Sequence, residues 1–184
     1  MVGDCDERSQ GSVDAARRGR LFAPALALCV AAFLWAAPAP QAARGSPPAQ
    51  GDAPLSLVRA TLLQAINETR RAHGLKPLVV DGKLVRAARF HSRVMLETHT
   101  FAHGDFARRM ARFRVAGRVM GENLAWGTGD AAAAQAIIQE WLVSPHHREN
   151  LLLPQFRRVG IGSRVGAFAG YDGATVVTVD FAGP

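Results

Sequence analysis

From about residue 55 onwards, apolar residues recur every three or four positions, and this spacing predicts amphipathic helices. Leu55, Leu62 and Ile66 fall on one face of the first helix, 55–73, and Gly74 is placed to end it. Asp and Ser side chains cap helix starts by accepting backbone hydrogen bonds, and Pro fits the first turn. The other predicted helices are 83–98, an Arg-rich helix at 105–115, one from Asp130 to Val143, and one that restarts at Ser144-Pro145. Asp81 is expected to cap the helix 83–98, and the residues expected to face inward on it are Leu84, Ala88, His91 and Met95.

The pattern changes towards the C-terminus, where β-branched residues run to alternation. Val159–Val165 and Thr175–Phe181 are therefore predicted strands, joined as a hairpin by the turn GAFAGYDG. The segment 118–127, with glycines near both ends, is expected to be a turn or a short strand. Helices first and an antiparallel hairpin last predict an α+β domain in which helices pack on a small sheet.

The first third of the chain has a different pattern, typical of an export signal. Residues 21–43 carry no charge, three arginines stand just before them, and the apolar core from Leu21 to Ala37 is followed by small residues. An uncut signal anchor is the alternative, since a spanning helix needs about 20 apolar residues. We therefore expect a signal peptide or signal anchor at 1–43, a Pro/Gly/Ser-rich linker at 44–54 and one domain at 55–184, in a secreted or cell-envelope protein.

Composition narrows the classes of function. At 48% hydrophobic and 20% charged, the chain is too apolar to be disordered throughout and is no highly charged nucleic-acid tail, so no specific nucleic-acid partner is expected. Both cysteines, Cys5 and Cys29, lie in the first thirty residues, which excludes a disulfide scaffold and a four-cysteine zinc site from the domain. No CxxC, GxSxG, HExxH or P-loop pattern occurs in the domain, and no catalytic residue is assigned.

Histidine and glutamate are the remaining candidates for chemistry. His103 stands in a short loop beside a glycine, Glu122 lies between apolar residues where an unpaired carboxylate would be costly to bury, and His147 falls in the first turn of a helix. Two imidazoles and one carboxylate suit zinc with an open coordination position, and they also suit acid–base work near neutral pH. The alternative is a Glu–His pair that only ties a loop to a helix.

Several short segments, taken in order over about residues 60–182, form a recognisable series. They are INETR at 66–70, GLKPL at 74–78, AARFH at 87–91, FAH at 101–103, GENLAW at 121–126, EWLVSPHHRENLL at 140–152, VGIG at 159–162 and VTVDFA at 177–182. Together they resemble the CAP superfamily (cysteine-rich secretory, antigen 5 and pathogenesis-related proteins) in its cysteine-free bacterial form. The resemblance implies an α-β-α sandwich with a central antiparallel sheet, in a secreted protein.

Family members carry a cavity lined by two His and two Glu, which in some cases binds a divalent metal. By the resemblance, His103 matches the first His and Glu122 the first Glu, whereas Ser144 stands where the second Glu usually is. His147 matches a His that bacterial relatives carry in the SPxHR segment. The full tetrad is therefore absent, and the resemblance implies a cluster of His103, Glu122 and His147, with Glu140 as a further member, for zinc or another divalent cation.

Three functions remain open at this point. The first is a secreted, non-enzymatic binding domain for a small amphipathic or lipid-like ligand or an envelope component. The second is a metal-assisted hydrolase of peptide or cell-wall bonds, and the third is a purely structural envelope protein. The arginine-rich segment Arg108–Arg114, with Arg118, is a candidate surface for anionic lipid or cell-wall polymer, and a solvated helix face is its alternative.

Overall fold

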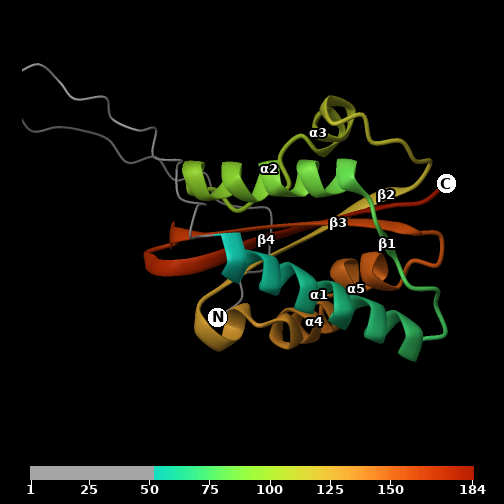
Figure 1. The fold of residues 1–184 in the computed structure, drawn as a ribbon, viewed down its shortest axis with the longest axis horizontal. Coiled ribbons are helices and arrows are strands. Elements are labelled where there is room, and N and C mark those ends of the chain that lie inside the picture. Colours follow the sequence, from blue (N-terminus) through green and yellow to red (C-terminus); the bar gives the residue numbers. More distant parts are fainter. Residues whose placement is uncertain (1–51) are drawn as a thin grey trace, which may run out of the picture. The chain divides into compact units, whose positions relative to one another are not determined.

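A four-stranded sheet lies between two layers of helices in the part of the chain that the structure describes, residues 52–184 (Figure 1). The structure is a computed structural model. This arrangement confirms the predicted α+β class and its α-β-α layers. The helices are α1 (Asp52–Ala72), α2 (Gly82–Thr98), α3 (Phe106–Arg112), α4 (Ala134–Val143) and α5 (Pro145–Leu152), with a 3-10 helix at Gly129–Ala132, and the strands are β1 (Val79–Val80), β2 (Met120–Gly127), β3 (Arg158–Phe168) and β4 (Tyr171–Ala182).

The sheet is mixed rather than wholly antiparallel. Its strand order is β1-β3-β4-β2, in which β4 pairs antiparallel with both β3 and β2, and β1 pairs parallel with β3. The expectation of an antiparallel sheet is therefore wrong at one edge, because a strand of two residues is too short to show alternation in the sequence. The segment 118–127 contains the eight-residue strand β2, which is longer than the turn or short strand expected there.

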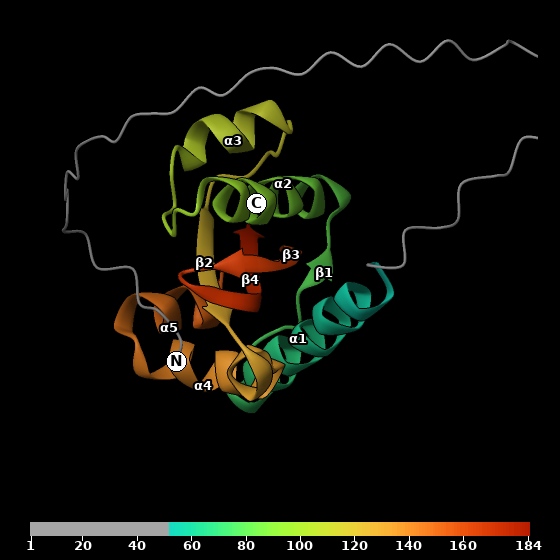
Figure 2. The ribbon, with the colours of Figure 1, turned by 90° about the vertical axis from the view of Figure 1, so that its left-hand side faces the viewer.

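Each face of the sheet is covered by its own helices. α2 and α3 cover one face, and α1, α4 and α5 cover the other (Figures 1 and 2). The larger core cluster lies on the α1 side, where Ile66 and Trp141 pack with Val179, all of them at most 1% exposed. The indole Nε1 of Trp141 also donates to the carbonyl of Leu124, 3.0 Å away. The sheet thus separates two buried layers of side chains, one packed against α1, α4 and α5 and the other against α2 and α3.

Strand alternation decides which layer each β4 side chain joins. Val177 and Val179 belong to the core cluster on the α1 side. Val176 packs with Met95 of α2, and the Thr178 hydroxyl accepts a hydrogen bond of 3.0 Å from Ser92 of α2. Even-numbered residues of this strand therefore face α2, and odd-numbered ones face α1, α4 and α5.

The start of α2 and its buried face agree with the prediction. Asp81 is the N-cap, and its Oδ1 accepts a hydrogen bond of 2.7 Å from the backbone N–H of Lys83. The four residues expected to face inward, Leu84, Ala88, His91 and Met95, are all buried.

Two other helix starts differ in detail. Asp130 lies in the 3-10 helix, and α4 begins only after Ala133, so Asp130 does not cap it. Ser144 precedes Pro145 of α5 as expected, but its side chain makes no capping hydrogen bond within the described residues. The rigid ring of Pro145 and its missing N–H already suit the first helical position.

The β3–β4 hairpin is tighter than predicted. The strands continue to Phe168 and resume at Tyr171, so only Ala169 and Gly170 form the turn, with φ of +51° and +83°. Two consecutive residues with positive φ match the right-handed twist of the flanking strands, which allows such a short connection.

The predicted leader, 1–43, lies outside the described residues, as does the linker 44–54 up to residue 51. α1 begins at Asp52, so the last three residues expected in the linker are helical. Within 52–184, none of the helices combines the length and the apolar character needed to cross a bilayer.

Candidate functional site

Two carboxylates are buried beside each other on the α2 side of the sheet. Glu122 of β2 and Asp180 of β4 stand directly opposite in the antiparallel register, so both side chains leave the same face. Glu122 is 6% exposed and Asp180 is fully buried. Two buried carboxylates repel each other and are costly to desolvate, so they require a nearby cation or a proton.

Arg109 of α3 supplies the cation. Its guanidinium is buried, contacts Glu122 Oε2 through Nη2, and lies 3.7 Å from Asp180 Oδ1. Its Nη1 donates a hydrogen bond of 3.0 Å to the carbonyl of His103. One guanidinium therefore neutralises one of the two carboxylates and holds the loop before α3 against the sheet.

Two histidines complete the cluster. His103 Nδ1 lies 2.8 Å from Glu122 Oε1, with the ring about half exposed. His91 Nε2 lies 3.0 Å from the Ala102 carbonyl, to which only a protonated ring nitrogen can donate, and 3.9 Å from Glu122 Oε2. Burial lowers the pKa of His91, against the attraction of Glu122. His91 is thus a hydrogen-bonded core residue, as its place on the inward face of its helix indicated.

Asp180 is the least compensated group of this cluster. Neither of its oxygens has a hydrogen-bond partner among the described residues. Burial raises the pKa of Asp180 well above its ordinary value of 3.8, the neighbouring charge of Glu122 raises it further, and Arg109 opposes both effects. The folded protein therefore retains a proton on Asp180 at pH values where the unfolded chain has lost it.

We expect Asp180→Asn to gain stability relative to the parent protein as the pH rises above 3.8. The raised pKa makes the proton on Asp180 stabilising at low pH, and this stabilisation is lost as the pH rises through the folded-state pKa. Urea unfolding of both proteins at steps from about pH 4 to about pH 8 measures the difference in the free energy of unfolding. Asp172→Asn, an exposed change on the same strand, is the control and should show no such trend. A difference for Asp180→Asn that is constant with pH would contradict the raised pKa.

The structure does not bring His147 and Glu140, the other two predicted site residues, to this cluster. Asn123, next to Glu122 on β2, points to the opposite face, where its side-chain amide donates to the carbonyl of His147 on α5, 2.9 Å away. The ring of His147 packs 6.3 Å from that of Trp141 in the same layer. Glu140 is exposed on α4. The sheet therefore lies between His147 and the His103–Glu122 pair.

The residues of the cluster do not fit a divalent cation. Both oxygens of Glu122 are already engaged, one by His103 and one by the guanidinium of Arg109, whose positive charge opposes a second cation. No group of three or more His, Cys, Asp or Glu side chains within 52–184 is arranged to hold a metal ion. The site for zinc or another divalent cation that the resemblance implies stays a prediction.

Sequence reasoning missed Arg109 and Asp180. Arg109 is one of several arginines in its segment, and nothing local distinguishes it from its exposed neighbours. Asp180 did carry a signal, because it interrupts the apolar strand Thr175–Phe181 in the same way that Glu122 interrupts its own segment. Glu122 and Asp180, two acidic residues in apolar strands of one small sheet, together indicated that they share a cation.

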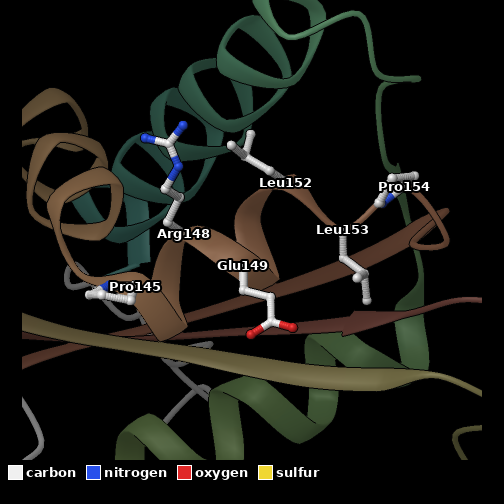
Figure 3. Close-up of a pocket in the computed structure, with 6 residues that line it drawn as sticks. All are labelled: Pro145, Arg148, Glu149, Leu152, Leu153 and Pro154. Carbon is white, nitrogen blue, oxygen red and sulfur yellow. The ribbon is translucent and has the colours of Figure 1, made fainter.

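A second feature is a hollow of about 440 Å³ on α5, in the other helical layer. Its walls are mainly apolar, from leucine and proline side chains, with one basic and one acidic group (Figure 3). Arg148 and Leu152 lie on one side of α5, and Glu149 and Leu153 on the other. The lining residues are Pro145, Arg148, Glu149, Leu152, Leu153 and Pro154.

Buried hydrogen bonds fix the backbone beside this hollow, at the C-terminal end of α5. Arg70 of α1 is fully buried and donates from Nη1 to the carbonyls of Leu151, at 2.8 Å, and Leu153, at 3.2 Å. Its Nε donates to the carbonyl of Lys76, at 3.1 Å, and its Nη2 to that of Phe156, at 3.4 Å. A single guanidinium thus ties the end of α5 and the following loop to α1.

Comparison with known proteins agrees with this architecture. Residues 63–181 match the family described as the cysteine-rich secretory protein family, CAP. The chain belongs to the CAP family. The match extends from within α1 to Phe181 of β4 and contains both the charged cluster and the α5 hollow.

Three bacterial proteins illustrate the similarity. This CAP chain is 30% identical to the uncharacterized protein YkwD of Bacillus subtilis (strain 168) over 113 residues, which are 59% of this chain and 43% of YkwD. An extracellular protein containing an SCP domain from Bacillus anthracis str. Ames shares 28% identity and a TM-score of 0.58, over 76% of this chain and 45% of that one. An outer surface protein of Borrelia burgdorferi shares the fold alone, with 22% identity and a TM-score of 0.59, over 70% and 94% of the two chains. The chain thus spans less than half the length of the first two relatives.

Proposed function

We propose that this CAP domain is a non-enzymatic binding domain of the cell exterior, which holds a small amphipathic or lipid-like component of the envelope in the α5 hollow. The hollow itself carries the proposal. It is a shallow hollow of about 440 Å³ that is open to solvent, and leucines and prolines supply most of its surface. The predicted leader at 1–43 and the relative described as extracellular support a location outside the cytoplasm.

The lining suits a molecule with an aliphatic part and a charged head. Leu152, Leu153 and Pro154 offer apolar surface to the aliphatic part, because such contacts remove apolar area from water. Arg148 and Glu149 offer one charge of each sign to a polar head. The Arg70 hydrogen bonds hold the backbone of Leu153 in place before any ligand binds, which limits the ordering cost of binding.

The charged cluster on the other face supports a non-enzymatic role. A general base must be available to the proton it removes, but both oxygens of Glu122 are engaged within the protein. The cation beside Glu122 is a guanidinium, which contacts Glu122 of the sheet and the backbone of the His103 loop. This is the arrangement of a structural ion pair, and it does not support the hydrolase hypothesis.

We expect Leu153→Gln to weaken binding of a dansyl-labelled fatty acid about fivefold or more, because part of a leucine surface contributes on the order of 1 kcal/mol. Fluorescence titration of the purified protein measures this affinity. Leu57→Gln is the matched control, since Leu57 is 65% exposed on α1 and does not line the hollow. Binding of the parent protein should be the same with and without EDTA.

Equal affinity of Leu153→Gln and Leu57→Gln would remove the hollow as the binding site. Loss of binding in EDTA would instead favour a metal-dependent function. Thermal unfolding of each variant shows whether a lower affinity reflects the site or a less stable fold.

A further inference from the structure

Arginines gather in a second hollow, on the α2 side of the sheet and away from α5. The hollow has a volume of about 400 Å³, is open to solvent, and lies between α2, the end of α3 and the middle of β3. Arg86, Arg89 and Arg93 follow one another along one side of α2, at helical spacing. The full lining is Arg86, Arg89, Phe90, Arg93, Arg112, Phe113 and Arg164, which we call the arginine groove.

The charge of this groove is not balanced by its own lining. Five of its seven lining residues are arginines, and none of the seven is Asp or Glu. The acidic Glu97 reaches Arg93 from one turn further along α2, at 3.8 Å, but both side chains are at least half exposed and such a pair contributes little. Like charges gathered in one concave surface raise the local concentration of anions.

Aromatic rings hold part of these arginines in place. The guanidinium of Arg112 lies over the ring of Phe90, 4.5 Å from its centre, and that of Arg93 lies 5.4 Å from the same ring. Phe90 in turn packs against Phe113, with ring centres 5.6 Å apart. Stacking uses the flat face of a guanidinium and leaves its in-plane N–H donors for an anion such as phosphate, whose oxygens the guanidinium can bind in a bidentate way.

The groove continues into a neighbouring hollow of about 280 Å³, and the two share Phe90 and Arg112. The neighbouring hollow adds Arg108, whereas its acidic Asp105 caps α3 and its buried Arg109 is already paired with Glu122. A groove of five arginines with Arg108 beyond it is larger than one phosphate group requires. It fits a chain that presents several phosphates in succession.

We propose that the arginine groove binds a linear polymer that carries repeated phosphate groups. A membrane surface fits less well, because none of the large exposed apolar side chains of the described region lines the groove to insert into a bilayer. A single-stranded nucleic acid fits less well too, because the face of Phe90 that a base would stack on is already covered by arginine. The sequence pointed to Arg108–Arg114, but of that segment only Arg112 and Phe113 line the groove, and α2 and β3 supply its other residues.

The test is binding of inorganic polyphosphate to the purified protein, measured by fluorescence anisotropy at two salt concentrations. The parent protein should lose at least tenfold in affinity between about 50 mM and about 200 mM salt, because each phosphate contact releases counterions. Arg86→Gln combined with Arg93→Gln should weaken binding about tenfold or more, because each change removes a charged hydrogen-bond donor to phosphate. Both positions are exposed, so thermal unfolding of the double variant should match that of the parent protein.

The matched control also removes two positive charges, but on the other side of the sheet. Arg71→Gln combined with Lys76→Gln, both exposed in the α1 layer on the other side of the sheet, should leave polyphosphate binding within about twofold of the parent protein. Equal losses in the two double variants would mean that net charge alone binds the polymer, and would overturn the proposal. Binding to phosphatidylglycerol vesicles but not to polyphosphate would overturn it in favour of a membrane surface, and tighter binding to single-stranded DNA than to polyphosphate in favour of nucleic acid. The dansyl fatty acid should bind the Arg86/Arg93 variant normally, which separates this site from the α5 hollow.

Discussion

Replacing Arg109 with methionine is expected to lower the free energy of unfolding by about 3–5 kcal/mol at neutral pH. The change removes the cation that contacts Glu122 and lies 3.7 Å from Asp180, and it leaves these two acidic side chains buried beside each other without that guanidinium. It also removes the hydrogen bond to the His103 carbonyl. Urea or thermal unfolding, followed by circular dichroism, measures the loss.

The chain offers a neighbouring control for this result. Arg108→Met removes the same charge one position earlier on α3, from an exposed side chain, and should change stability by about 0.5 kcal/mol or less. Adding Asp180→Asn to the Arg109 variant should recover part of the loss, because the side chain opposite Glu122 can then no longer ionise. A loss of the same size for Arg108→Met and Arg109→Met would show that Arg109 does not stabilise the cluster.

Replacing Gly162 with alanine is expected to cost about 3 kcal/mol, at the upper end of the usual overpacking penalty. α2 lies directly on β3 at this point, and a Cβ on Gly162 would stand 2.2 Å from the carbonyl carbon of Ala88. Gly160 meets Leu84 one turn earlier in the same way, at 2.1 Å. The obstructing atoms are helix backbone, which cannot rotate away, so α2 must move off the sheet.

Gly82→Ala is the control for the general effect of losing a glycine. Gly82 lies at the start of α2, and its Cβ would meet only the end of the flexible Arg86 side chain, 3.7 Å away. Alanine should be neutral or slightly stabilising there, because it lowers the conformational entropy of the unfolded chain. Chemical denaturation of both variants tests the pair. If Gly162→Ala is as stable as Gly82→Ala, the close contact of α2 with β3 is not present in solution.

Local patterns predicted those parts of the molecule that depend on neighbours in sequence. The capping oxygen of Asp81 and the inward spacing of Leu84, Ala88, His91 and Met95 act within one or two turns, so a short window of residues contains the whole signal. The hairpin strands were recognised for the same reason. The short strand β1 was missed, because it forms only when β3 is present to pair with it.

The candidate site was predicted only in part. His103 and Glu122 were identified from their unusual settings and are in contact, at 2.8 Å. His147 was placed with them by resemblance, although Asn123, one residue from Glu122, turns to the opposite face and meets His147 there. A shift of one residue along a strand exchanges the two faces of a sheet, and neither spacing nor composition shows which face a distant helix covers.

The sequence by itself determined the α+β class, the helix with its Asp81 cap, the resemblance to the CAP family and the pair of His103 with Glu122. Tertiary structure alone decided that Asp180 stands opposite Glu122, that Arg109 among many arginines is the buried one, and that Arg164 joins Arg86 at one groove. The physical reason is the range of the interactions. Helix periods and caps arise from residues a few positions apart, whereas register, burial and the clustering of charge depend on which distant segments pack together.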